Sequence, residues 1–257
     1  MNRRVFLGSL GSLASVGTLA YATREPVDTV EVRVWLSEGA AQYDGVADRI
    51  REYLERFLDF EFWSLELSFG EPVSTSTEDG ARVTSSGEWP VALAAGAVGR
   101  RDIDPVSDVN LLVTDGQMRE APTGYGLPHV ASVGGARYIA ELESVDELYD
   151  LSEVDTDRRV VPNDRRIRTM QILIHEIGHA LGLQHEHGVS FRDGDAIVAT
   201  PMLSSYAWSS NYDGDHSHCG ASYPDPGDHA RKLSFEFSTC ARRELAEYNG
   251  GLLYSRQ

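Results

Sequence analysis

Residues 175–185 read HEIGHALGLQH, and the rest of the chain is interpreted outward from this stretch. Apolar residues recur at three- and four-residue steps from Met170 to Leu181, a pattern typical of a helix with one face in a core. We expect this helix to begin near Ile167. Gly182 ends it, because glycine adopts a left-handed conformation that is costly for other residues. The chain can therefore turn back toward the helix after Gly182.

The same stretch carries three histidines and one carboxylate in a metal-binding pattern. His175 and His179 are four residues apart and share one helix face, and the turn at Gly182 lets His185 join them. Glu176 is rotated by roughly 100° from His175, so it can reach a water bound to the metal. Three imidazoles plus a water form the catalytic type of zinc site. The stretch predicts Zn²⁺ bound by three histidines, although other divalent metals stay open. Histidines that are merely hydrogen-bonded would not explain Glu176 or Gly182.

The segment resembles the zinc-binding signature HExxHxxGxxH of the metzincin metallopeptidases. That resemblance implies a methionine turn beneath the metal, and the segment PMLSSY at 201–206 fits it, with Met202 17 residues after His185. An ordinary core methionine is the alternative for Met202. The family pattern further implies a five-element sheet, an active-site helix and a later C-terminal helix. It also implies a substrate peptide added to an edge strand, for which 124–140 is the candidate.

The branch of the metzincins is not resolved by these residues. Glu186 directly after the third histidine resembles the astacins. The spacing from His185 to Met202 is closer to that of matrixin-like proteins, and Tyr206 stands four residues after Met202 instead of the two typical of astacins. Tyr206 is either an oxyanion-stabilising hydroxyl or a tyrosine packed in the core.

Outside this stretch, hydrophobic periodicity predicts an α/β (α+β) fold. The expected fold is metzincin-like, with a twisted mixed sheet, an active-site helix and a smaller, irregular C-terminal subdomain that ends in a helix. We expect one catalytic domain over 23–257, divided into subdomains of about 23–185 and 186–257. The expected elements are strands at 30–36, 63–69, 91–98, 109–113 and 130–140, helices at 46–58 and 234–248, an exposed loop at 71–90 and a polar stretch at 141–166.

The first 22 residues have the composition of an export signal. Arg3 and Arg4 precede a short apolar run that ends in the small residues around Ala20–Ala22, and the paired arginines resemble a twin-arginine signal. An uncleaved N-terminal anchor is the alternative. Export predicts a disulfide between Cys219 and Cys240, with two reduced thiols as the alternative reading. We therefore expect an extracellular or cell-surface protein without stable membrane insertion after signal removal.

The composition and net charge of the chain exclude some classes of binding partner. The chain has 257 residues, 41% of them hydrophobic, and a formal net charge of −17. Such a charge repels phosphate backbones, so nucleic-acid binding is not expected. Lys232 is the only lysine, and an acidic, lysine-poor surface is typical of halophilic proteins, although an ordinary acidic protein has the same signs. We expect a monomer that acts on a peptide or protein substrate.

Two further segments carry weaker metal-binding patterns. Asn211, Asp213 and Asp215 resemble part of a calcium loop, but its closing glutamate is missing and a polar turn explains them equally well. The segment His216–Cys219 offers alternating ligands for a second metal. Neither pattern adds to the zinc prediction.

Taken together, these residues predict an exported zinc-dependent endopeptidase. Glu176 would act as general base for a metal-activated water. Two rival functions remain at this stage. One is a non-catalytic surface binding protein that is stabilised by zinc, and the other is a metal-dependent amidase acting on cell-envelope material.

Overall fold

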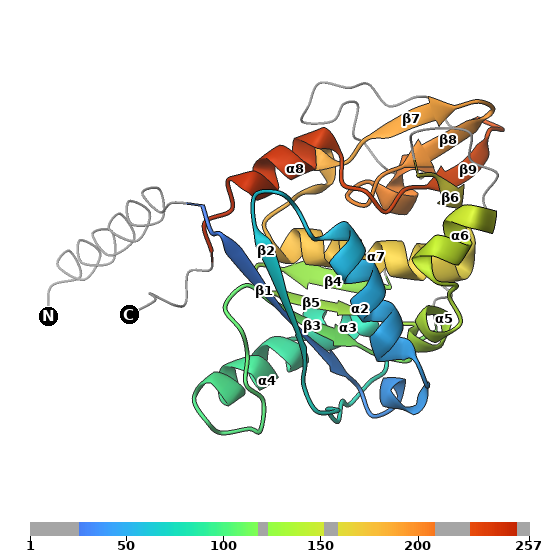
Figure 1. Cartoon of the computed structure of the whole chain (residues 1–257). Helices are drawn as coiled ribbons and strands as arrows, with labels where there is room; N and C mark the ends of the chain where they lie inside the picture. Colours follow the sequence, from blue (N-terminus) through green and yellow to red (C-terminus); the bar gives the residue numbers. More distant parts are fainter. Residues whose placement is uncertain (1–25, 118–122, 152–158, 209–226, 251–257) are drawn as a thin grey trace, which may run out of the picture.

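The main sheet has five strands in the order β2-β1-β3-β5-β4 (Figure 1). The computed structural model describes residues 26–117, 123–151, 159–208 and 227–250. Strands β2, β1, β3 and β5 run parallel to one another, and β4 pairs antiparallel with β5. Strand β4 is the last in the order and forms one edge of this sheet. The strands are β1 (Thr29–Leu36), β2 (Ser64–Phe69), β3 (Val109–Val113), β4 (Gly124–Leu127) and β5 (Val130–Val133).

Helices cover both faces of the sheet. Neighbouring residues of a strand point to opposite faces, and both faces carry apolar side chains that pack against helices. Val34 and Leu111 pack into the larger core with helices α2 (Val46–Phe57), α5 (Ala136–Ala140) and α7 (Arg165–Ala180). Trp35 and Leu112 face the smaller core with α3 (Gly80–Ser85) and α4 (Glu88–Ala97). Strand β3 is buried along its whole length, as expected for a strand covered on both faces. The sheet is therefore the middle layer of a mixed α/β fold.

A second, smaller sheet lies beyond α7, in the order β6-β9-β8-β7 (Figure 1). It comprises β6 (Val161–Pro162), β7 (Ser190–Asp193), β8 (Ala196–Ala199) and β9 (Ala230–Leu233). The prediction of an irregular C-terminal region is wrong here, since β7, β8 and β9 lie in that region. The strands of this sheet have only two to four residues, so they leave a weak pattern in the sequence. Strand β6 precedes α7 in the chain, so this sheet joins segments from both sides of residue 185.

The predicted strand at 91–98 is wrong, since this segment belongs to α4. A short apolar run does not separate strand from helix by periodicity, and the alanines of this run favour the helix. The expected loop at 71–90 contains α3, whose N-cap Asp79 accepts a hydrogen bond from the Arg82 amide. The expected strand at 130–140 ends after Val133, and α5 follows it.

Two helix boundaries are set by side-chain caps that periodicity does not reveal. Helix α7 begins at Arg165, two residues earlier than expected, because Asp164 accepts a hydrogen bond from the Ile167 amide. Helix α8 (Thr239–Ala246) is shorter than predicted and is capped by Ser238. The polar stretch at 141–166 contains the short helix α6 (Val145–Leu151) as well as β6. The short 3-10 helices among the described residues are η1 (Ala40–Gln42), η2 (His185–His187) and η3 (Ser204–Trp208).

Several predictions fall on residues that the structure does not describe. The export signal at 1–22, the calcium pattern at 211–215 and the ligand pattern at 216–219 lie outside the described ranges. Cys240 is disulfide-bonded, but Cys219 also lies outside them, so its pairing stays a prediction. Within the described ranges, no helix combines the length and apolar character needed to cross a bilayer.

Candidate metal centre

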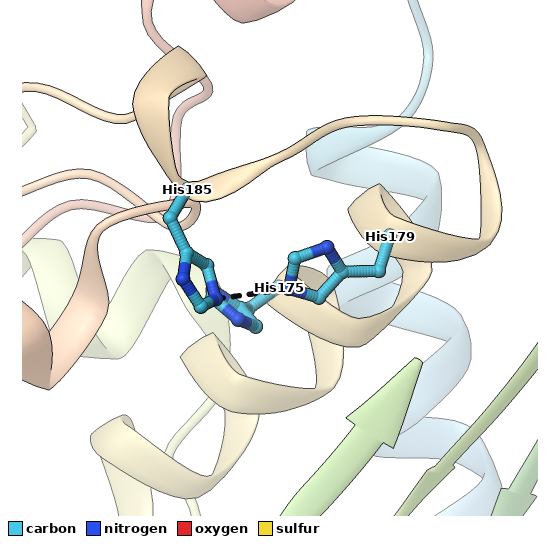
Figure 2. Close-up of side chains that lie close together, drawn as sticks. All are labelled: His175, His179 and His185. Atoms are coloured by element: carbon cyan, nitrogen blue, oxygen red, sulfur yellow. Dashed lines mark hydrogen bonds between the residues drawn. The ribbon is translucent and has the colours of Figure 1, made fainter. Parts of the chain in front are cut away.

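The three predicted histidines converge on one point. Candidate ligand atoms of His175, His179 and His185 all lie within 4.8 Å of one another. The Nε2 atoms of His179 and His185 are 3.1 Å apart, and the rings turn toward each other (Figure 2). The His175 and His179 rings are nearly perpendicular, with centroids 4.6 Å apart. In the described part of the chain, these residues form the one cluster with the geometry to hold a metal ion.

Backbone carbonyls fix the orientation of two of these rings. His175 Nδ1 lies 2.6 Å from the Pro201 carbonyl oxygen, and His179 Nδ1 lies 2.8 Å from that of Leu183. A carbonyl oxygen only accepts hydrogen bonds, so each Nδ1 carries the proton and each Nε2 presents its lone pair. Outer hydrogen bonds of this kind orient the histidine ligands of metal sites. Sequence reasoning missed both carbonyls, because no side chain marks them.

Helix α7 places two of the ligands, and the return of the chain places the third. Gly182 has φ +93°, as expected for the left-handed turn that ends the helix. The Leu183 amide donates to the Gly178 carbonyl, and η2 then begins at His185. Gly182 therefore allows the chain to fold back so that His185 faces the helix.

Met202 packs against helix α7 at Gly178. Its side chain is fully buried, and its Sδ occupies the space that a Cβ on Gly178 would need. Met202 is not among the candidate ligands. Its role as the hydrophobic floor of the site stays a prediction.

Gln171, one turn before His175, ties the helix to the methionine segment. Its Nε2 donates to the carbonyl oxygens of Ala199 and Ser234, at 2.9 and 2.8 Å. Its Oε1 accepts a hydrogen bond from the Ser204 hydroxyl at 2.9 Å. Sequence reasoning missed this role, although a glutamine within an apolar helix face is a signal of a buried polar contact.

Burial keeps the imidazoles neutral. Desolvation lowers the pKa of His175 to about 3, with a smaller contribution from His179. Desolvation also lowers the pKa of His185 to about 4, and it lowers the pKa of His179 as well. Neutral imidazole is the form that binds a metal, so the site is prepared for binding at neutral pH.

Glu176 lies in the same cleft and is 6% exposed. Burial raises the pKa of its carboxyl from 4.5 to about 8, because desolvation disfavours the charged form. A carboxylate with a raised pKa holds a proton more strongly at neutral pH. Such a shift is typical of acid–base residues at functional sites.

We expect this shift to make the metal-free protein less stable as pH rises. The unfolded chain loses the Glu176 proton near pH 4.5, whereas the folded chain keeps it up to about pH 8. Unfolding therefore releases a proton between these values, so the free energy of unfolding falls as pH rises through them. Glu176→Gln removes this dependence, and each pKa unit is worth about 1.4 kcal/mol. Urea unfolding with a chelator from pH 5 to 8 should show the variant gaining stability over the unmodified protein. A difference that stays constant across this range would contradict the prediction.

The cleft has a volume of about 390 Å³ and opens beside the edge strand β4. Its lining comprises residues 124–128, the three histidines, Glu176, Gln184 and Tyr206. Tyr206 is 36% exposed and its ring centroid lies 4.4 Å from that of His185, so the packed-core interpretation of Tyr206 is wrong. The candidate edge segment is confirmed as an edge strand only over Gly124–Leu127.

These features define a candidate three-histidine metal site on a mixed α/β fold. No model of a known protein family matches the chain, and no curated protein matches it.

Proposed function

We propose that this protein is a zinc-dependent endopeptidase of metzincin type. The observation that carries the proposal is a buried carboxyl, Glu176, lining one open cleft together with three converging imidazoles. A site that only stabilised the fold would have no use for a buried carboxyl in an open cleft. The five-stranded sheet, with an antiparallel edge strand beside the helix, and the buried Met202 support the placement in this class.

The donor set fits zinc. His175, His179 and His185 offer three neutral nitrogen donors, and outer carbonyls orient two of them. Three protein nitrogens with access to solvent are typical of catalytic zinc sites. When bound, Zn²⁺ supplies a Lewis acid and lowers the pKa of a coordinated water to about 7.

The protein's own groups would then handle the protons. Glu176 takes a proton from the attacking water through its carboxyl oxygen and passes it to the nitrogen of the leaving amine. The positive charge of an ion held by the three imidazoles would favour the ionised form of this carboxyl, which is the form that accepts the proton. Tyr206, at the cleft beside His185, would donate a hydrogen bond from its hydroxyl to the oxygen that gains charge at the scissile carbonyl.

The substrate would be an extended peptide. Strand β4 is an edge strand, and an extended chain can add to such an edge through main-chain hydrogen bonds. Among the described residues, five large hydrophobic side chains are exposed, and three of them line the cleft: Tyr125, Leu127 and Tyr206. This concentration favours peptides with apolar side chains near the bond that is cut.

We further propose that the protein is exported by the twin-arginine route. This part of the proposal is supported by Arg3, Arg4 and the apolar run that follows them. It is independent of the site.

The direct test is a digest of a peptide library by the zinc-loaded protein, paired with metal analysis at low and high salt. We expect about one zinc per chain and cleavage at internal bonds, with apolar residues enriched around the cut. Zinc binding without turnover would support the rival binding protein, and release of amines only from cell-envelope material would support the amidase. Either result would contradict the proposal.

A further inference from the structure

Two glycines of β4 face the candidate metal helix. Gly124 and Gly126 are two residues apart, so they point to the same side of the strand. Neither has a positive φ, so the backbone at both positions would accept other residues. The reason for glycine must therefore lie in what a side chain would touch.

A Cβ at the two positions would meet different atoms of α7. At Gly126 it would lie 2.5 Å from His179 Cβ, 2.8 Å from the Glu176 backbone oxygen and 3.0 Å from Glu176 Oε2. At Gly124 its three nearest atoms all belong to the Glu176 side chain: Oε1 at 2.6 Å, Cγ at 2.7 Å and Cδ at 3.0 Å. Both glycines therefore border the carboxyl group, but the tightest contacts at Gly126 are with His179 and the helix backbone, whereas those at Gly124 are with the Glu176 side chain alone.

We propose that Gly124 is a positioning residue for the Glu176 carboxyl. This inference rests on the proposed function, because it assigns Glu176 the task of moving protons. The bare backbone of β4 forms a wall against one side of the carboxyl group, and the open side of that group is the cleft. The wall excludes water from the covered side, which contributes to the burial of Glu176, and it leaves no room for the carboxyl to swing toward the sheet. The edge strand therefore has a second task besides pairing with a substrate.

The first experiment measures turnover in Gly124→Ala. A methyl group at this position displaces the carboxyl, and a misplacement of about 1 Å can reduce a rate by about 100-fold. We expect a fall in kcat of that order, with zinc content unchanged and a smaller change in KM. A rise in KM with kcat unchanged would show that Gly124 only contacts the substrate, and this result would overturn the proposal.

The second experiment needs no activity and uses metal-free protein. Gly124→Ala is made in three backgrounds: unmodified, Glu176→Gln and Glu176→Ala. Overpacking should lower Tm by about 3–10 °C in the first two, where the side chain at 176 keeps its length. In Glu176→Ala the clashing atoms are gone, so the loss should nearly vanish. Equal losses in all three backgrounds would contradict the proposal. If Gly124→Ala alone does not fold, the double variant with Glu176→Ala should still fold.

Gly96→Ala is the matched control. A Cβ there would press on the backbone and side chain of Ile103 in the smaller core, away from the site. It should lower Tm similarly in all three backgrounds without a selective loss of kcat. If the unmodified protein cleaves no peptide, the proposed function fails, and the Tm comparison still decides whether Gly124 positions Glu176.

Discussion

Replacing Glu176 by Gln should leave about one zinc per chain and lower kcat on an unfolded protein substrate by about 10²–10⁴-fold, the usual contribution of a general acid–base group. Glutamine has nearly the same size and is neutral, as the buried carboxyl is in the metal-free protein at neutral pH. The fold and the three histidines should therefore be preserved. What is lost is the group that accepts the proton of the attacking water.

The measurement combines steady-state kinetics with metal analysis of the same samples. Glu186→Gln is the matched control, because it makes the same chemical change at an exposed carboxyl next to His185. It should retain activity within a few-fold. Full activity in Glu176→Gln would remove this residue from its proposed role and leave the cleft without an identified base.

Replacing His185 by Ala should abolish stoichiometric zinc binding and, with it, peptide cleavage. His175 and His179 remain on one helix face, but two imidazoles bind an ion far more weakly than three. Loss of an outer hydrogen bond to a ligand typically costs 10–100-fold in metal affinity, so loss of a ligand should cost more than about 100-fold. Titration with zinc, followed by calorimetry or by the rise in Tm that a bound ligand produces, measures this loss.

His229→Ala is the control for the second variant. His229 is half-buried, and its Nδ1 lies 3.1 Å from the Asp195 carbonyl oxygen, in a loop contact outside the cluster. Zinc binding should be unchanged in it. If His185→Ala binds zinc as tightly as the unmodified protein, His185 is not a ligand and the ion uses a different set of residues.

The parts of the fold that sequence analysis predicted correctly have strong local patterns. The alternation in Thr29–Leu36 and the three- and four-residue steps in Val46–Phe57 each bury one face, so periodicity finds them. Periodicity failed for residues 91–98, because their apolar run has no dominant period. Only the packing of this segment near Trp35 and Leu112 shows which of its faces is buried. Strands β6 and β9 were missed because they are stabilised by pairing between segments far apart in the chain. Strands β7 and β8 form a local hairpin, and they were missed because each has only four residues.

What the sequence determined by itself is the ligand set. The four-residue step from His175 to His179 and the glycine at 182 act within one helix and one turn, where local geometry dictates the outcome. Only the tertiary structure decided the properties of those ligands and of the carboxyl beside them. The Pro201 carbonyl that orients His175 is 26 residues from it along the chain, and the glycine wall of β4 belongs to a different element. The burial that keeps the imidazoles neutral and Glu176 protonated in the metal-free protein comes from packing as a whole. Desolvation and hydrogen bonding depend on which segments of the chain pack together. The spacing of residues along one helix does not show which segments these are.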